Sequence, residues 1–212
     1  MADLPETARS PTPQAMPMVP RVGRVRRRRR EGPQVVTLEI GFDGAAGPAP
    51  TCMPGQFNML TAFGVGEVPI GLSGELEGAE TLIHTIRAVG LVSSALAGLG
   101  RGDPVGVRGP FGAGWPMTVA PLSDVVIVAG GLGLAPLRPV LYRLMAERDR
   151  YGNVVLLYGT RRPEEILFRR EIEHWREVRL DAFFRRMQDQ LGHLCAPDQH
   201  HEDPRYGAHV VP

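Results

Sequence analysis

Alternation of apolar and polar side chains is the first regular feature of the chain. Val36, Leu38 and Ile40 alternate with Thr37 and Glu39, which is the two-residue period of a strand with one buried face. Similar short segments, separated by Gly/Pro turns, lie at 56–61, 68–73, 82–89 and 105–108. Together with a helical insert at 92–99, this pattern predicts a small antiparallel β-barrel.

A different architecture is predicted from residue 124 onward. The segment 124–129 is almost continuously apolar and ends in glycines, which predicts a strand buried on both faces of a parallel sheet. Apolar positions at helical spacing follow between 137 and 145, then a second apolar strand at 154–158 and a helix that begins at Pro163. The predicted fold class is therefore a β-barrel plus an α/β domain of the doubly wound type.

The pattern changes after Trp175. The next apolar positions have the spacing of one amphipathic helix: Leu180, Phe183, Phe184, Met187 and Leu191. No third parallel strand is predicted, and two strands make a poor parallel sheet, so the α/β domain is expected to be incomplete. The predicted organisation is a flexible leader at 1–20, a barrel at 21–120, a partial α/β domain at 123–176 and a divergent tail at 177–212.

Charge and cysteine usage narrow the possible functions. The 212-residue chain has a formal net charge of +1 and two cysteines, Cys52 and Cys195. A balanced charge creates no global field that favours nucleic acid or an anionic membrane. No run approaches the ~18 apolar residues of a membrane span, and two thiols supply no disulfide framework. We expect a soluble, cytoplasmic protein that binds neither nucleic acid nor membrane.

A glycine-rich segment, Ala129-Gly-Gly-Leu-Gly-Leu-Ala-Pro136, separates the first buried strand of the α/β region from its helix. Glycines allow a tight turn and the close approach of a phosphate, and the start of a helix offers unpaired N–H groups and a positive dipole end. The segment departs from a strict GxGxxG pattern, and a tight turn without a ligand is the alternative interpretation.

Seven blocks occur in the order found in one known family. They are Pro54-Gly-Gln-Phe-Asn-Met-Leu60, Gly64-Val-Gly-Glu-Val-Pro-Ile70, His84-Thr-Ile-Arg-Ala-Val-Gly90, Gly102-Asp103, Arg108-Gly-Pro-Phe-Gly112, Val128-Ala-Gly-Gly-Leu-Gly-Leu-Ala-Pro-Leu-Arg138 and Tyr158-Gly-Thr-Arg161. On these blocks the chain resembles the ferredoxin–NADP reductase superfamily. Its nearest resemblance is to the gamma subunit of cytoplasmic Ni/Fe hydrogenases and sulfur reductases, relatives of the electron-transfer subunit of dihydroorotate dehydrogenase.

The resemblance implies that FAD binds at the edge of the barrel. The flavin ring would lie against 68–73, its ribityl and phosphate groups along 84–87, and its pyrophosphate at the helix start 90–93. The implied flavin contacts are Val68, Pro69, Ile70, Gly71, Leu72, Ser73, His84, Thr85, Ile86, Arg87, Gly90, Leu91, Val92 and Ser93. Gly71 replaces a hydroxyl that family members offer, so the ring contact is expected to be weaker. Each segment also has an alternative interpretation without a ligand: an ordinary edge strand for 68–73, a packed or solvated side chain for His84, and an ordinary helix N-cap for 90–93.

The resemblance also implies a site for NAD(P)H, as electron donor or acceptor. Its implied contacts are Gly130, Gly131, Gly133, Leu134, Ala135, Pro136, Gly159 and Arg161. Arg161 would meet the adenosine ribose or a 2′-phosphate, and the alternative is a solvated turn arginine. No catalytic acid or base is assigned.

By the same resemblance, the protein is expected to pass electrons between NAD(P)H, FAD and a redox partner subunit of the hydrogenase or sulfur-reductase type. The alternative is a non-catalytic flavin-binding or partner-docking remnant, because the second domain looks truncated. Relatives carry a late cysteine cluster for a [2Fe–2S] centre. This chain lacks the necessary ligands, so no iron–sulfur cluster is predicted.

Two further segments invite other interpretations. The run Arg26–Arg30 is typical of phosphate-binding patches, but the balanced total charge and the lack of interleaved aromatics argue against a nucleic-acid site. The resemblance implies that this segment is the first barrel strand, which makes a solvated strand and turn the better explanation. His193, Cys195, His200 and His201 are able to ligate metals, yet their spacing matches no closed zinc site. No metal site is predicted.

Overall fold

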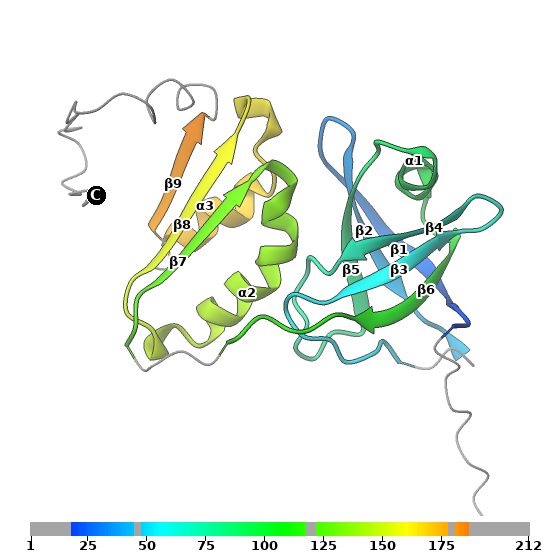
Figure 1. Cartoon of the computed structure of the whole chain (residues 1–212), viewed down its shortest axis with the longest axis horizontal. Coiled ribbons are helices and arrows are strands. Elements are labelled where there is room, and N and C mark those ends of the chain that lie inside the picture. Colours follow the sequence, from blue (N-terminus) through cyan, green and yellow to red (C-terminus); the bar gives the residue numbers. More distant parts are fainter. Residues whose placement is uncertain (1–17, 45–47, 118–121, 178–180, 187–212) are drawn as a thin grey trace, which may run out of the picture.

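Two β-sheets lie side by side in the computed structural model, which describes residues 18–44, 48–117, 122–177 and 181–186 (Figure 1). The first sheet is antiparallel and has six strands in the order β4-β3-β6-β1-β2-β5. Its elements are β1 (Arg21–Gly32), β2 (Val35–Gly41), β3 (Phe57–Ala62), β4 (Gly66–Gly71), β5 (Thr81–Arg87), helix α1 (Leu91–Gly98) and β6 (Pro104–Phe111).

The antiparallel sheet curls toward a barrel. Its edge strands β4 and β5 meet at an isolated bridge between Leu72 and His84, without a continuous ladder between them. Leu38, Leu60 and Ile86 are fully buried inside it, and Leu96 of α1 closes one end of this core. The predicted small antiparallel barrel is therefore confirmed, because the alternating apolar positions form one continuous inner surface.

The second sheet is parallel and has the order β7-β8-β9. Its elements are β7 (Val125–Gly130), α2 (Leu134–Ala146), β8 (Val154–Thr160), α3 (Arg169–Glu177) and β9 (Asp181–Arg186), with 3₁₀ turns at Gly131–Gly133, Arg148–Arg150 and Pro163–Glu165. Pro163 was predicted to begin an α-helix. It begins only a 3₁₀ turn, and α3 starts at Arg169.

The absence of a third parallel strand was wrongly predicted. β9 pairs in parallel with β8 along its whole length, with Phe183 opposite Leu157 and Phe184 opposite Tyr158. The helical spacing of Phe183 and Phe184 was misleading, because pairing with a neighbouring strand overrides local periodicity. β9 therefore extends the parallel sheet beyond residue 176, the predicted end of this domain.

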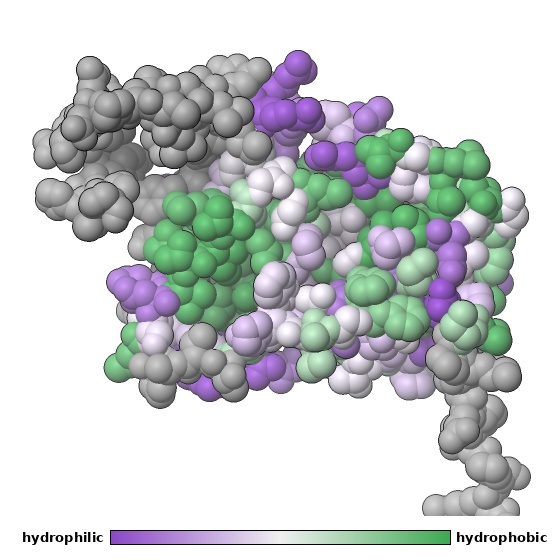
Figure 2. Space-filling view, in the orientation of Figure 1, coloured by the Kyte–Doolittle hydropathy of each residue, from purple (hydrophilic) through white to green (hydrophobic). Residues whose placement is uncertain are grey.

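Burial of β7 on both faces was also wrongly predicted. Ile127 and Ala129 are buried, whereas Val126 is 60% and Val128 69% exposed. The strand order β7-β8-β9 runs in one direction, so two right-handed crossovers place α2 and α3 on the same face. The other face carries an exposed apolar patch over the sheet (Figure 2), to which Leu157 also contributes.

The remaining sequence predictions concern segments or properties at the margins of the fold. The basic run Arg26–Arg30 lies in β1 and is exposed, which confirms the solvated strand. None of the helices among the described residues is long and apolar enough to cross a membrane. Most of the predicted leader, and the tail after 186, lie outside the described residues.

Candidate cofactor site between the barrel and the parallel sheet

The glycine segment forms the turn between β7 and α2. Gly130 ends β7 and lies in register with Gly159 of β8, so two predicted contacts meet at the carboxyl edge of the sheet. Gly131 has φ +50, a backbone conformation that favours glycine, and Gly133 has an unstrained φ of −61. The N–H of Leu134, the first residue of α2, donates to the carbonyl of Gly131, and Pro136 has no N–H, so in the first turn of α2 the N–H of Ala135 is the donor left for an anion.

Tyr158 shapes this turn. Its buried side chain reaches from β8, and its hydroxyl donates a hydrogen bond to the carbonyl of Gly131 at 2.9 Å. The same hydroxyl accepts one from the main-chain N–H of Leu167 at 3.3 Å. Burial raises the pKa of Tyr158, which keeps this donor protonated. Tyr158 stood in a matched sequence block, but its role depends on tertiary contacts that the sequence does not display.

The second helix start, at α1, has Gly90 as its N-cap in an extended conformation. Ser93 is the third residue of the helix, and its Oγ accepts hydrogen bonds from the main-chain N–H groups of Gly90 at 3.0 Å and Val89 at 3.2 Å. The Ser93 hydroxyl therefore holds the loop, whereas the N–H groups of the first helical turn remain for an anion. This geometry fits a phosphate at the predicted position.

Strand β4, which contains most of the segment predicted to contact the flavin ring and is called the flavin strand below, ends at Gly71, close to the glycine turn. A Cβ added at Gly71 would lie 3.3 Å from the Cβ of Pro136, so the missing side chain permits close packing of the end of β4 against α2. Gly71 and Pro136 were predicted as contacts of different cofactors, and the structure brings them together. Along β4, Pro69 is exposed and Val68 and Ile70 are half-buried, so the strand offers an accessible face.

Most predicted side chains on β5 are buried. His84 is fully buried, as are Ile86 and nearly all of Thr85, whose hydroxyl pairs with that of Ser73 at 2.8 Å. These side chains, with those of Leu72 and Ser73, are therefore unavailable to a ligand in this structure. Alternation along the strand turns His84 and Ile86 into the barrel, whereas Thr85 points to the opposite face and is buried there beside Ser73 and Thr37.

His84 has an indirect role in shaping the site. Asn58 donates to its Nε2 at 3.2 Å, and its Nδ1 donates to the carbonyl of Gly71 at 3.0 Å. Burial lowers the pKa of His84 to about 4, so the ring is neutral near pH 7. The histidine thus fixes the main chain at the end of the flavin strand.

Arg87 and Arg161 line one cavity of about 270 Å³ between the two sheets, together with Gln34 and Glu165. The guanidinium of Arg161 pairs with Glu165 at 3.2 Å and is 67% exposed. A Cβ at Gly131 would lie 3.9 Å from a terminal nitrogen of Arg87, which places this cation beside the glycine turn. Two cations predicted for different cofactors are therefore close to both helix starts.

Arg138 joins the two domains and was not among the predicted contacts. Its side chain is 2% exposed and donates hydrogen bonds to the main-chain carbonyl of Ser73, to Glu171 at 2.7 Å and to the hydroxyl of Tyr142 at 2.7 Å. Its guanidinium also lies 3.9 Å from the ring centre of Phe168. The position of Arg138 in a matched block was the available signal, but a helical arginine is usually solvated.

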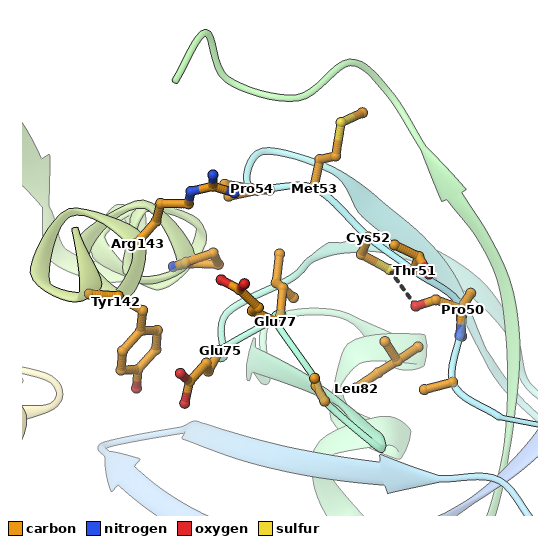
Figure 3. A pocket seen from close by; sticks show the side chains of 16 residues that line it. Pro50, Thr51, Cys52, Met53, Pro54, Glu75, Glu77, Leu82, Tyr142 and Arg143 are labelled. Carbon is orange, nitrogen blue, oxygen red and sulfur yellow. Dashed lines mark hydrogen bonds between the residues drawn. The ribbon is translucent and has the colours of Figure 1, made fainter. Parts of the chain in front are cut away.

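A larger cavity of about 480 Å³ lies between α2 and the barrel loops (Figure 3). Glu75 and Glu77 extend into it from the segment before β5, and Tyr142 and Arg143 line it on the α2 side. None of the predicted contacts is among its described lining residues. Burial raises the pKa of Cys52, also in this cavity, to about 11, so its thiol is not a nucleophile near neutral pH.

Metal ligation has no basis in the described part of the chain. No group of three His, Cys, Asp or Glu side chains is clustered there. The metal-capable residues of the tail, from His193 to His201, lie outside the described residues.

Comparison with known proteins shows which families this chain is similar to. Residues 127–196 match the family described as an oxidoreductase NAD-binding domain. The sulfhydrogenase 2 subunit gamma of Pyrococcus furiosus is 40% identical over 124 residues, or 58% of this chain and 42% of that protein. A probable dihydroorotate dehydrogenase B (NAD(+)) electron transfer subunit of Methanocella arvoryzae is 40% identical over 116 residues, or 54% and 40% of the two chains.

Solved structures show the same fold. The ferredoxin–NADP+ reductase from Plasmodium falciparum superposes with a TM-score of 0.68 at 17% identity, over 82% of this chain and 75% of that chain. Phthalate dioxygenase reductase gives a TM-score of 0.67 at 20% identity, over 78% and 52%. The chain therefore has the fold of these reductases, a barrel followed by a nucleotide-binding α/β domain. The sequence is similar to sulfhydrogenase gamma subunits, and the chain spans less than half the length of the curated relatives it matches.

The end of β4, the glycine turn and the start of α1 are neighbours, because Gly71 lies close to Pro136, Gly131 lies close to Arg87, and Arg87 lines one cavity with Val89. This cavity suits an anionic group, because Arg87 and Arg161 line it and Glu165 is the one carboxylate among its described lining residues.

Proposed function

We propose that the chain is an electron-transfer subunit that binds FAD at the barrel edge and NAD(P)H at the glycine turn, and passes electrons to a partner redox subunit. The observation that carries the proposal is the contact of Gly71 with Pro136, because it joins the end of the proposed flavin strand to the start of the proposed nucleotide helix. The matched relatives are themselves named as subunits, which supports a partner of the hydrogenase or sulfur-reductase type.

The bound cofactors would supply the chemistry, which is hydride transfer from nicotinamide to flavin followed by the release of single electrons. The protein itself would contribute by holding the two cofactors in the correct relative orientation. The N–H groups at Gly90–Ser93 and Gly131–Gly133 would hold the two pyrophosphates, and Arg87 would neutralise charge between them. His84 fixes the main chain at Gly71, and Arg138 holds Ser73 against α2.

No side chain is assigned to move a proton. Near neutral pH the buried His84 is neutral, and its two ring nitrogens are occupied by Asn58 and Gly71. Arg161 would contact the adenosine ribose of the nicotinamide nucleotide only after partly releasing Glu165. The domains that carry these sites are proposed to divide between residues 120 and 123.

A second candidate function is a non-catalytic flavin-binding subunit that docks a partner. The exposed apolar face of the parallel sheet, with Val126 and Val128, favours it, because such patches commonly mark interaction surfaces.

One experiment separates the two functions. The full chain is purified, supplied with excess FAD, made anaerobic and mixed with NADH. The main proposal predicts a yellow protein whose flavin absorbance bleaches. A stable flavin spectrum that NADH does not change would select the non-catalytic alternative. A chain that takes up no FAD would overturn both.

A further inference from the structure

Strand β1 is paired on both sides over only part of its length. Its residues 21–24 pair with β6, and Val25 exchanges main-chain hydrogen bonds with Gly102 and Asp103, at 2.8 and 3.0 Å. Beyond Val25, β1 pairs with β2 alone among the described residues. Main-chain N–H and C=O groups on the unpaired side of such a strand are available to another strand. Residues 27–30 therefore form an open strand edge, called the arginine edge below.

Positive charge is concentrated at the arginine edge. Its four residues, Arg27–Arg30, are all exposed. A groove of about 600 Å³ adjoins the edge and is lined by Arg26, Arg27, Arg28, Glu39 and Arg101. Glu39 is the one carboxylate among the described residues that line this groove. The groove therefore carries an excess of positive charge.

Most of these cations have no carboxylate partner within the described part of the chain. Arg27 and Arg101 make no hydrogen bond or ion pair there. Arg28 and Arg30 donate only to main-chain carbonyls, at 3.1 and 3.4 Å. Arg29 is the one member of the arginine edge that is ion-paired with described residues. The edge therefore attracts an anionic partner, which its own neighbours do not replace.

An open edge and unpaired arginines together select one kind of partner. An extended peptide segment bonds to the main chain of an open edge and adds to the sheet as a further strand. Carboxylates on that segment would pair with the guanidinium groups. A second copy of the edge would place arginine opposite arginine, which is destabilising. Nucleic acid would match the charge, but it has no peptide groups with which to continue a sheet.

The register of β1 with β2 indicates where the acidic side chains should lie. Arg28 stands opposite Leu38 and Arg30 opposite Val36, so these two arginines share one face of the sheet. Both lack an ion pair, whereas Arg29, on the other face, already has one. A strand whose acidic residues alternate with uncharged ones would therefore match this edge, because alternate side chains of a strand share a face.

We propose that the arginine edge docks an extended acidic segment of a partner protein, which adds to β1 as a further strand. The inference rests on the proposed function only in giving the chain a partner, and it requires no bound cofactor. Main-chain hydrogen bonds would supply the register, and Arg28 and Arg30 would select the acidic sequence.

The test uses a fluorescein-labelled peptide of about eight residues in which Glu and Thr alternate, and follows its anisotropy as the full chain is added. Two matched peptides separate charge from strand pairing. A Gln-Thr peptide lacks the charge, and a Glu-Pro peptide keeps the charge but cannot donate to a ladder. Both should bind roughly tenfold or more weakly than the Glu-Thr peptide. The Glu-Thr peptide should also slow amide hydrogen exchange in β1.

The R28Q/R30Q variant should weaken binding of the Glu-Thr peptide roughly tenfold. The matched control is R143Q/R150Q, which removes the same formal charge from exposed residues at the end of α2, so its affinity should remain unchanged. The comparison of the three peptides needs no variant, so it decides the question even if R28Q/R30Q fails to fold.

Several results would overturn the inference. Equal binding of the Glu-Thr and Glu-Pro peptides would indicate charge attraction without an added strand. Single-stranded DNA that competes as well as the Glu-Thr peptide would indicate a nucleic-acid surface instead. Absence of Glu-Thr binding would leave no docking edge. None of these results would alter the reduction of bound flavin by NADH, so the proposed function stands or fails separately.

Discussion

The guanidinium of Arg138, on α2, donates a hydrogen bond to the main-chain carbonyl of Ser73, just beyond β4. The same group is paired with Glu171 of α3, and Glu171 also accepts a hydrogen bond from Arg29 of β1 at 3.3 Å. One buried cation therefore joins the flavin strand, both helices of the second domain and the first barrel strand. This contact links the strand proposed to bind the flavin to the helix that follows the proposed nucleotide turn.

Replacing Arg138 should destabilise the protein markedly. Arg138→Leu leaves Glu171 and the Ser73 carbonyl without their partner in a largely buried site, and such losses cost about 3 kcal/mol in free energy of unfolding. The measurement is urea denaturation. Arg143→Leu is the control, because Arg143 is exposed and its helical pair with Glu147 contributes only ~0.5 kcal/mol. Equal effects of the two substitutions would contradict the structural role of Arg138.

The glycine turn provides a substitution that separates binding from folding. A Cβ at Gly133 would meet no protein atom within 4 Å, and its φ of −61 suits alanine. Gly133→Ala should therefore leave the melting temperature unchanged, yet weaken NADH binding roughly tenfold, because the methyl group occupies space that an approaching phosphate needs. Isothermal titration with NADH measures this effect. Gly100→Ala, at a loop outside the site, should leave NADH affinity unchanged. An unaltered affinity in Gly133→Ala would remove this turn from the proposed site.

His84 should make stability depend on pH. Burial lowers its pKa from 6.5 in the unfolded chain to about 4 in the folded protein, so the unfolded state binds more protons between these values. The stabilising contribution is complete above about pH 6.5 and is lost as the pH falls toward 4, on the order of 3 kcal/mol. Unfolding free energies measured across this range should fall less steeply in His84→Gln than in the unmodified chain. Parallel slopes would exclude His84 as the titrating group.

Local pattern predicted the barrel and the glycine turn well. Val36, Leu38 and Ile40 alternate without interruption, and the barrel buries all three. The turn at Gly130–Gly133 was predictable because a strand before it and an amphipathic helix after it leave few other arrangements. In both cases the local signal and the tertiary structure agree.

Tertiary contacts decided the features that the sequence did not predict. Phe183 has the sequence spacing of a helix, but it lies in strand β9 and pairs with Leu157 of β8. The apolar sequence of β7 does not reveal that helices cover only one face of the strand. His84 lies in a block that the family resemblance associates with flavin, whereas strand alternation turns its ring inward. From the sequence alone, Arg138 looks like a solvated arginine on a helix, because its burial depends on contacts with α3 and Ser73 that only the fold creates.

The one-sided covering of the parallel sheet has a consequence for how the isolated chain behaves in solution. Val126 and Val128 form a row of branched side chains in contact with water, and excluded salts such as sulfate strengthen the burial of such surface. Concentrated sulfate should therefore drive copies of the chain to cluster through this row, whereas low ionic strength should keep them dispersed.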